Sequence, residues 1–404
     1  MINPLSGSKV ILGVTGSIAC YKAADLASKL TQEGAQVDVV LTQGASNFIT
    51  PLTFRSLTHR PVITDLFDVD SEQAVAHVAM AHSADIIVVA PATAHFIAKL
   101  AHGMADDALT TTILASAASV AIAPSMDGYM FDNPATQENL DKLQERGVTI
   151  IGPAEGHLAS GLRGVGRLVE VPQIMDIIRA LLGKQGDMAG RSLVVSAGGT
   201  QEPIDPARVI TNRSSGKMGY ALAEAARDRG ARVTLVTAPT SIPDPAGVDT
   251  KHVTTVAEMR EAVLSACMDA DALIMAAAVS DYRPAHVASQ KVKKDEDGEE
   301  MVLHLVKNAD FFLEVPEGVL RVGFAAETED LLANARKKIT AKGLAFIAAN
   351  DITAPDSGFN VDTNRVTILD RDGSMDELPL LSKYDVGHRI LDRVVKLLSR
   401  PTNS

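Results

Sequence analysis

The segment Thr211–Gly219 carries more chemistry than any other stretch of this chain. It places an amide, a guanidinium, two hydroxyls and an ammonium within six residues, in the order Asn-Arg-Ser-Ser-Gly-Lys. An apolar run at 193–196 and a glycine loop at 197–200 precede it, and a helical pattern begins at Tyr220. In a strand–loop–helix unit, backbone N–H groups and the positive end of the helix converge on an anion. These residue types suit a ligand that carries phosphates and a carboxyl group to be activated.

This composition is also typical of an ordinary solvated loop. The order of the residues therefore decides between such a loop and a ligand site. The order Thr-Asn-Arg-Ser-Ser-Gly-Lys-Met-Gly resembles the signature of the phosphopantothenate–cysteine ligases. Further segments follow in the order of that family, at 276–283, 291–294, 307–308, 323–328 and 349–351. The first half of the chain resembles the flavin-dependent phosphopantothenoylcysteine decarboxylases. Together the two resemblances cover nearly the whole chain and imply a bifunctional family of coenzyme A biosynthesis.

Amide formation at neutral pH requires activation of the carboxylate, which needs cations around a triphosphate, a metal and a donor to the acyl oxygen. Lys338 and Lys342 lie four residues apart, on one face of a helical pattern. Lysines on an exposed helix are ordinarily solvated, and a lone Phe such as Phe324 ordinarily belongs to the core. The resemblance to the ligases favours a nucleotide site instead.

That resemblance implies transfer of CMP from CTP to the carboxylate of 4'-phosphopantothenate, followed by attack of the amine of cysteine. It implies that Asn212 stabilises the acyl-cytidylate and that Lys291 is also catalytic. Asp281 is expected to contact the cytosine amino group or to hold Mg²⁺, and the residues leave both roles open. The implied CTP site consists of Met275, Ala276, Ala277, Asp281, Lys291, Lys307, Asn308, Ala309, Asp310, Phe324, Lys338 and Lys342.

In the first half, hydroxyl side chains stand at the carboxyl ends of three predicted strands, where ligands of parallel sheets bind. Taken singly, each of these Ser or Thr residues is more simply a helix N-cap. The resemblance to the decarboxylases implies that they hold FMN, at an interface between subunits of a homo-oligomer. The implied FMN site consists of Gly16, Ser17, Thr42, Thr93, Ala94, Met104 and Asp106.

The resemblance also implies a catalytic His77, although an isolated His on an apolar helix is otherwise a core residue. Asp127 and Ser160 occupy the positions of an Asn that contacts the substrate carboxylate and a Cys that supplies a proton in that family. Asp127 places a like charge beside the carboxylate unless it is protonated or turned away. The Ser160 hydroxyl is a far weaker acid than a thiol. We expect a flavin-dependent decarboxylase with altered acid chemistry; the alternative is a ligase whose first domain binds FMN without catalysis or for regulation.

Short, fully apolar runs separated by helical patterns predict parallel sheets covered on both faces. The strand–glycine loop–helix pattern begins at Val10 and starts again at Leu193, after a linker at 183–190. We predict an α/β protein with two doubly wound, mostly parallel-sheet domains, flavodoxin-like over 1–188 and Rossmann-like over 189–404. Neither glycine loop is G-x-G-x-x-G, and both second strands end in Thr where a nicotinamide enzyme needs an acid, which argues against a dehydrogenase.

The net charge of −12, without a basic stripe, argues against a nucleic-acid partner. The sequence has no apolar run of 18 residues, so we expect no membrane partner. Cys20 and Cys267 lie far apart in apolar segments, which is typical of a reducing compartment. Because the N-terminal segment also lacks a signal-peptide pattern, we expect a cytoplasmic protein. Its expected partners are the small molecules 4'-phosphopantothenate, cysteine and CTP.

Overall fold

The computed structural model describes residues 3–65, 76–293, 301–327, 331–351, 358 and 361–399. The chain divides into two compact units, Met1–Gly183 and Lys184–Ser404. Each unit is built on a mostly parallel sheet between two layers of helices, which confirms the predicted fold class. Within the described ranges, no helix is both long enough and apolar enough to cross a membrane.

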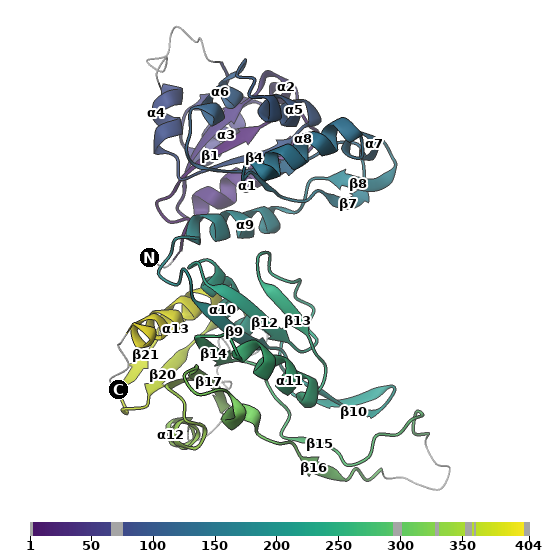
Figure 1. Ribbon diagram of the computed structural model, residues 1–404, viewed down its shortest axis with the longest axis vertical. Coiled ribbons are helices and arrows are strands. Elements are labelled where there is room, and N and C mark those ends of the chain that lie inside the picture. Colours follow the sequence, from purple (N-terminus) through teal and green to yellow (C-terminus); the bar gives the residue numbers. More distant parts are fainter. Residues whose placement is uncertain are drawn as a thin grey trace. The chain divides into compact units, whose positions relative to one another are not determined.

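The first unit contains a six-stranded parallel sheet in the order β3-β2-β1-β4-β5-β6 (Figure 1). Strand β4 is buried along its whole length, so its sequence shows no alternation of apolar and polar residues. The strand order reverses between β1 and β4, and a crevice for ligands is expected outside the carboxyl ends of strands at such a point. The strands are β1 Lys9–Val14, β2 Gln36–Leu41, β3 Val62–Ile63, β4 Ile86–Ala92, β5 Ser119–Pro124 and β6 Thr149–Ile150.

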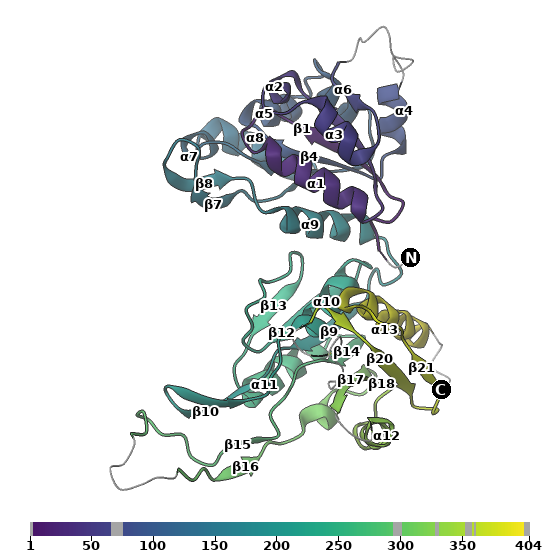
Figure 2. The same cartoon turned by 180° about the vertical axis from the view of Figure 1, so that it is seen from behind.

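Helices cover both faces of this sheet (Figures 1 and 2). Helices α1, α3 and α9 pack on one face, and α4, α5, α6 and α8 pack on the other. A separate antiparallel hairpin joins β7 Ala154–His157 to β8 Arg163–Arg167. The helices are α1 Cys20–Gln32, α2 Gln43–Ser46, α3 Pro51–Thr58, α4 Ala76–Ser83, α5 Ala94–His102, α6 Ala108–Leu114, α7 Gly128–Phe131, α8 Pro134–Glu145 and α9 Val171–Gly183.

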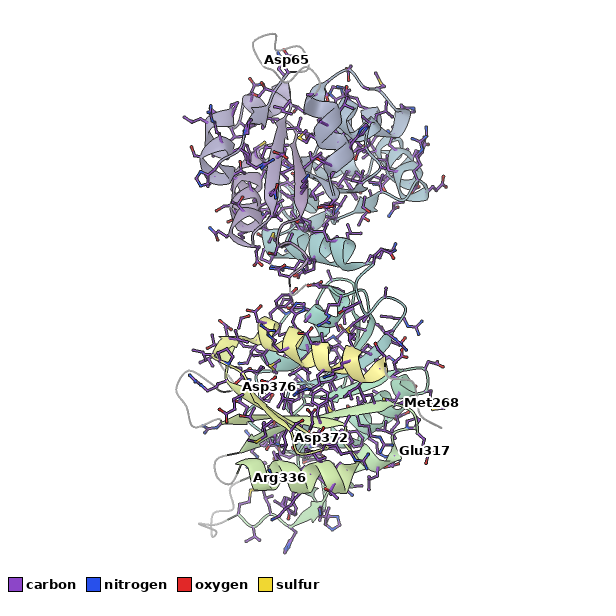
Figure 3. The ribbon with its side chains drawn as sticks, turned by 90° about the vertical axis from the view of Figure 1, so that its left-hand side faces the viewer. Asp65, Met268, Glu317, Arg336, Asp372 and Asp376 are labelled. Carbon is purple, nitrogen blue, oxygen red and sulfur yellow. The ribbon has the colours of Figure 1, made fainter. Side chains whose placement is uncertain are left out.

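The second unit contains an eight-stranded sheet in the order β13-β12-β9-β14-β17-β18-β20-β21. The first six strands are parallel, and the last two run antiparallel to their neighbours. Figure 3 labels Asp372 and Asp376 at the β20–β21 edge. The strands are β9 Ser192–Ala197, β12 Arg232–Thr237, β13 Asp249–His252, β14 Ala272–Met275, β17 Leu320–Glu327, β18 Phe346–Asp351, β20 Val366–Asp370 and β21 Met375–Glu377.

Helices α10 and α13 pack on one face of this sheet, and α11 and α12 pack on the other. Figure 3 shows α13 and α12, the latter marked by Arg336, on opposite sides of the strands. Two short strands, β19 Thr363–Asn364 and β22 Leu381–Ser382, pair with each other before α13 begins. The helices are α10 Lys217–Arg227, α11 Val256–Cys267, α12 Leu331–Lys342, α13 Lys383–Leu398 and a 3-10 helix at Phe311–Glu314.

An arm extends from the second unit (Figure 1). It consists of the hairpin of β10 Gln201–Asp205 with β11 Arg208–Thr211, and of β15 Tyr282–Pro284 paired with β16 Leu305–Lys307. The backbone N–H of Ala288 donates to Ile204 O at 3.0 Å and joins the two hairpins. Residues 294–300 of the arm lie outside the described ranges.

Candidate functional site

A cavity of about 600 Å³ opens in the second unit, at the carboxyl ends of β14, β17 and β18. It is lined by residues from α10, the β14–β15 connection, the segment after β16, α12 and α13. Most of the residues predicted to bind CTP, together with Asn212, lie on its wall. These are Asn212, Met275, Ala276, Ala277, Asp281, Lys307, Asn308, Ala309, Asp310, Phe324, Lys338 and Lys342.

Glycines bring the Asn212 loop against the sheet. A Cβ at Gly199 would lie 2.7 Å from Asn212 O, so only glycine allows this approach. A Cβ at Gly219 would lie 2.7 Å from Ser196 O, and α10 therefore packs directly on β9. The side-chain amide of Asn212 donates to Val279 O at 3.2 Å. This bond holds the amide beside the β14–β15 connection, at the edge of the cavity.

The segment after β16 positions the opposite wall. The backbone N–H of Asn308 donates to Asp281 O at 2.8 Å, and its side chain donates to Ser280 O at 2.9 Å. Lys342 forms an ion pair of 2.9 Å with Asp310, and its ammonium lies 5.6 Å from the centre of the Phe312 ring. Burial acts to raise the pKa of Asp310, but the hydrogen bonds from Lys342 and Phe312 and the charges of Lys342 and Lys307 together outweigh it, so this pKa lies below its ordinary value. The wall thus presents an ionised Asp310 held between lysines.

In the first unit, the loops that follow the parallel strands meet at one edge. Thr15 donates to Pro91 O at 2.8 Å, and the hydroxyls of Ser17 and Ser125 lie 3.1 Å apart. A Cβ at Gly16 would lie 2.9 Å from the backbone carbon of Gly44, so the loops after β1 and β2 touch through glycines. This close approach leaves a backbone cradle at the edge where a cofactor phosphate would bind.

The remaining residues predicted for the flavin site are placed less closely together. Thr42 and Thr93 cap α2 and α5, and Ala94 begins α5, so these hydroxyls do act as N-caps, at the predicted edge. Met104 is exposed in the turn before α6, where Asp106 forms a 2.6 Å ion pair with Lys99. His77 lies in α4, but its side chain is outside the described part.

The two positions that depart from the decarboxylase pattern lie together. The Ser160 hydroxyl donates to Oδ2 of Asp127 at 2.6 Å. Oδ1 of Asp127 accepts the backbone N–H of Tyr129 at 3.0 Å, which makes Asp127 the N-cap of α7. The carboxylate is therefore engaged by both of its oxygens and ties the tip of the β7–β8 hairpin to the segment after β5.

Both units match known protein families. Residues 3–183 match the family model described as Flavoprotein, and residues 188–398 match the DNA/pantothenate metabolism flavoprotein C-terminal domain. The coenzyme A biosynthesis bifunctional protein CoaBC of Bacillus subtilis (strain 168) is 46% identical over 399 residues, which cover 97% of this chain and 98% of that protein. The chain belongs to the bifunctional coenzyme A biosynthesis protein family.

The chain is also similar to a second full-length protein of this family and to a solved C-terminal domain. The protein of the same name from Vibrio parahaemolyticus serotype O3:K6 is 44% identical over 98% of this chain and 99% of its own length. A crystal structure of the C-terminal domain of such a bifunctional protein shares 38% identity, with a TM-score of 0.45, and covers 53% of this chain and 98% of that one. The chain is thus a bifunctional enzyme with a decarboxylase and a ligase activity. The full-length similarity does not favour a ligase with a non-catalytic first domain.

One residue predicted for this bifunctional enzyme lies elsewhere. Lys291 is exposed on the arm and is not part of the described lining of the cavity. Its neighbour Val292 is bound to the β10–β11 hairpin, because its N–H donates to Asp205 at 3.1 Å and its carbonyl accepts from Arg208 at 3.0 Å. The catalytic role of Lys291 therefore remains a prediction. It requires that Lys291 reach a nucleotide in some way other than from the described wall of this cavity.

The structure also brings to the cavity residues that are not part of the CTP site predicted for this bifunctional enzyme. Lys217, Asn364 and Lys383 form a wall together with Asn350 and Gly358. Ser382 caps α13, so the sequence does mark where this helix begins. It carries no sign that Lys383, in the first turn, reaches a site built mostly 40 to 170 residues earlier, because that depends on how α13 packs on α10.

Whether the described residues of this bifunctional enzyme can hold a metal ion depends on how their ligand side chains are grouped. Across the described ranges, no group of three or more His, Cys, Asp or Glu side chains is arranged to hold a metal ion. Mg²⁺ is commonly bound by one or two carboxylates together with substrate phosphates. A single carboxylate such as Asp281, on a wall shared with lysines, fits a metal that arrives with a nucleotide.

Proposed function

We propose that the cavity of the second unit binds CTP and 4'-phosphopantothenate and joins the acid to cysteine through an acyl-cytidylate. The observation that carries this proposal is the convergence of Asn212, Asp281 and the α12 lysines on one cavity. About 600 Å³ lies within the range of small-molecule sites, roughly 300–1,000 Å³. The first unit then decarboxylates the product, 4'-phosphopantothenoylcysteine, to 4'-phosphopantetheine.

The proposed ligation proceeds by two displacement reactions, and residues of the cavity assist each of them. A carboxylate oxygen of the acid attacks the α-phosphorus of CTP, and pyrophosphate leaves. Lys307, Lys338 and Lys342 offset the charge of the phosphates, which otherwise repel the carboxylate. The cysteine nitrogen then attacks the acyl carbon, and CMP leaves. The Asn212 amide donates to the acyl oxygen as its negative charge develops.

Pyrophosphate release tests the ligase site. With 4'-phosphopantothenate present, it should require CTP and Mg²⁺, and ATP should substitute poorly. Asn212→Asp should lower turnover by about 10²–10³, because a donor is replaced by a charge beside the acyl-cytidylate, while CTP binding persists. Asn47→Asp, at an exposed position of the first unit, should leave turnover unchanged. Equal turnover with ATP, or an active Asn212→Asp enzyme, would contradict the assignment.

We propose FMN as the flavin of the first unit. Its phosphate would be held by the Gly16–Gly44 cradle with Ser17, and its ring system would lie near Thr42 and Thr93. When bound, FMN supplies the oxidation of the cysteine thiol that makes loss of CO2 easy. The residues of the chain orient the substrate and exclude water, with His77, Asp127 and Ser160 as the predicted acid–base and carboxylate-contacting groups.

We also propose that a second copy of the chain covers the flavin edge. Large apolar side chains are exposed in the segments that follow β1, β2 and β5, namely Ile18 (62%), Phe48 (52%) and Tyr129 (80%). Side chains of this size favour burial by about 1.5–3 kcal/mol each. Sedimentation analysis should show an oligomer, and Tyr129→Ser with Ile18→Ser should dissociate it and release flavin. A monomer that retains flavin would contradict the interface site.

A further inference from the structure

The wall of the cavity formed by Lys217 and Lys383 is cationic and has no role in the mechanism above. The Lys217 ammonium forms an ion pair of 2.6 Å with Oδ1 of Asp362. The Asp362 side chain is 89% exposed, whereas that of Lys217 is 35% exposed and lines the cavity. An ion pair with so exposed a partner contributes only about 0–1 kcal/mol, so a more highly charged anion can displace the carboxylate.

Lys383 fixes the backbone of this wall. It is 5% exposed, and its ammonium donates to Gly358 O at 2.8 Å and to Val361 O. Its own backbone N–H donates to Asp362 O at 2.9 Å. The side chain and the main chain of one residue thus hold the segment that carries Asp362.

The two ammonium groups are close enough to influence each other. Burial, and after it the charge of Lys217, lowers the pKa of Lys383 to about 8, although Asp362 acts in the opposite direction. Two ammonium groups beside one carboxylate leave the wall positive. A ligand with two negative charges would relieve the repulsion between the lysines.

The proposed reaction brings two phosphorylated molecules into one cavity. The triphosphate of CTP is assigned to Lys307, Lys338 and Lys342, on elements other than those of Lys217 and Lys383. The acid substrate carries a phosphate at the end remote from its reacting carboxyl group. If both anions shared one group of lysines, they would repel each other and the carboxylate could not lie against the α-phosphorus.

We propose that Lys217 binds the phosphate of the acid substrate in exchange for Asp362, and that Lys383 is the positioning residue that fixes this subsite. The proposal rests on the ligase function above and names the residues that make the enzyme prefer a phosphorylated acid to an unphosphorylated one. Two of them, Asp362 and Lys383, lie more than 140 residues from Asn212 in the sequence.

The test compares 4'-phosphopantothenate with pantothenate. Lys217→Met should raise the KM for 4'-phosphopantothenate about tenfold or more, because a charge-assisted hydrogen bond is lost. Its KM values for pantothenate and CTP should stay within about twofold of wild type, since neither contact changes. Asp362→Asn should act in the opposite direction and lower the KM for 4'-phosphopantothenate about threefold, because the competing carboxylate is removed.

Lys383→Met should reproduce the selective effect of Lys217→Met. Lys396→Met is the matched control, because it removes an exposed ammonium from the same helix and should change no KM. Asp362→Asn keeps the test valid if Lys383→Met fails to fold, since the Asp362 side chain is almost fully exposed. A Lys217→Met enzyme that keeps the wild-type preference for the phosphorylated acid, or whose KM for CTP rises equally, would overturn the proposal.

Calorimetric titration without CTP separates this proposal from the proposed function. Wild-type protein should bind 4'-phosphopantothenate more tightly than pantothenate, and Lys217→Met should abolish the difference. If no CTP-dependent pyrophosphate release occurred but this difference remained, the ligase chemistry would fail and the anion subsite would stand. If the protein released pyrophosphate with CTP but bound both acids equally, the subsite would fail and the ligase function would stand.

Discussion

The Ser160 hydroxyl and the Asp127 carboxylate form a hydrogen bond of 2.6 Å. These are the two positions at which the chain departs from the decarboxylase pattern, and the departures are therefore direct partners. Because Asp127 also caps α7, its carboxylate is oriented by two donors. The pair links the β7–β8 hairpin to the segment after β5, so a change at either residue affects the other.

Ser160→Cys should raise the yield of saturated 4'-phosphopantetheine per CO2 released. A thiol is a much stronger acid than a hydroxyl, and the last step of the reaction needs a proton from the protein. The measurement is quantification of CO2 and of the thiol products from 4'-phosphopantothenoylcysteine. Ser56→Cys, on an exposed position of α3, is the matched control and should leave the ratio unchanged.

The hydrogen bond between Ser160 and Asp127 also predicts that substitutions at the two positions are coupled. Since Ser160 and Asp127 are in contact, the effects of Ser160→Cys and Asp127→Asn should not add, with a coupling of roughly 0.5–3 kcal/mol in the activation free energy. The double variant restores the residue types of the family and should give the highest yield. Additive effects would show that the contact does not persist when substrate is bound.

Lys291→Gln should sharply reduce pyrophosphate release, although Lys291 lies outside the described lining of its own cavity. The arm that carries it exposes Val302 (75%), Leu305 (45%) and Val306 (40%), which suits contact with another copy of the chain. If Lys291 acts in the cavity of that copy, mixing Lys291→Gln with Asn212→Asp protein should restore part of the activity. Mixed samples as inactive as the separate variants would contradict action between subunits.

The central strands could be predicted because they are apolar runs that both layers of helices bury, as β4 is along its whole length. The second strand of each domain was predicted to end in Thr, and β12 does end at Thr237, whereas Thr42 directly follows β2. The hydroxyl residues Thr42 and Thr93 were placed at the correct edge, since a parallel strand always delivers its carboxyl end there. Their use as N-caps was the simpler of the two interpretations considered.

Pairings between distant segments could not be predicted in the same way. A polar turn at 295–298 predicts a local hairpin, and these residues lie outside the described ranges. The pairing that the structure describes on either side joins β16 to β15, where Tyr282 lies opposite Lys307. The partners are 25 residues apart, and local pattern carries no information on such a register. The position of Lys383 was inaccessible for a similar reason, because it is determined by the packing of α13 on α10.

Gly16→Ala should reduce the flavin content of purified protein. The added Cβ would lie 2.9 Å from the carbon and 3.0 Å from the oxygen of Gly44, a backbone that cannot rotate away. The loops after β1 and β2 must then separate and the proposed phosphate cradle widens. Gly164→Ala is the matched control, because its Cβ meets only Leu158 at an ordinary 3.7 Å. The ratio of flavin absorbance to polypeptide is the measurement, and an undiminished ratio in Gly16→Ala would contradict the cradle.

His388 makes the second unit sensitive to acid. Its side chain is 0% exposed, and neither ring nitrogen has a hydrogen-bond partner in the part of the chain that the structure describes. Burial, and after it the charge of Arg229, lowers its pKa from 6.5 to about 4, although Asp385 and Asp392 act in the opposite direction. The folded protein therefore holds a neutral imidazole at pH values where the unfolded chain binds a proton.

Acid therefore lowers the stability of the second unit through His388. The stabilisation that comes from the neutral His388 is complete above pH 6.5. It is lost as the pH falls from 6.5 towards 4, which lowers the free energy of unfolding by about 3 kcal/mol in total. His388→Leu removes this titration. As the pH falls from 6.5 to 4, the melting temperature of His388→Leu should therefore rise steadily relative to that of wild type. Calorimetric melting of both proteins between pH 4 and 8 measures the difference. His304→Leu, at an exposed position on the arm, is the matched control. A constant difference for His388→Leu would show that its imidazole titrates in the folded protein as it does in the unfolded chain.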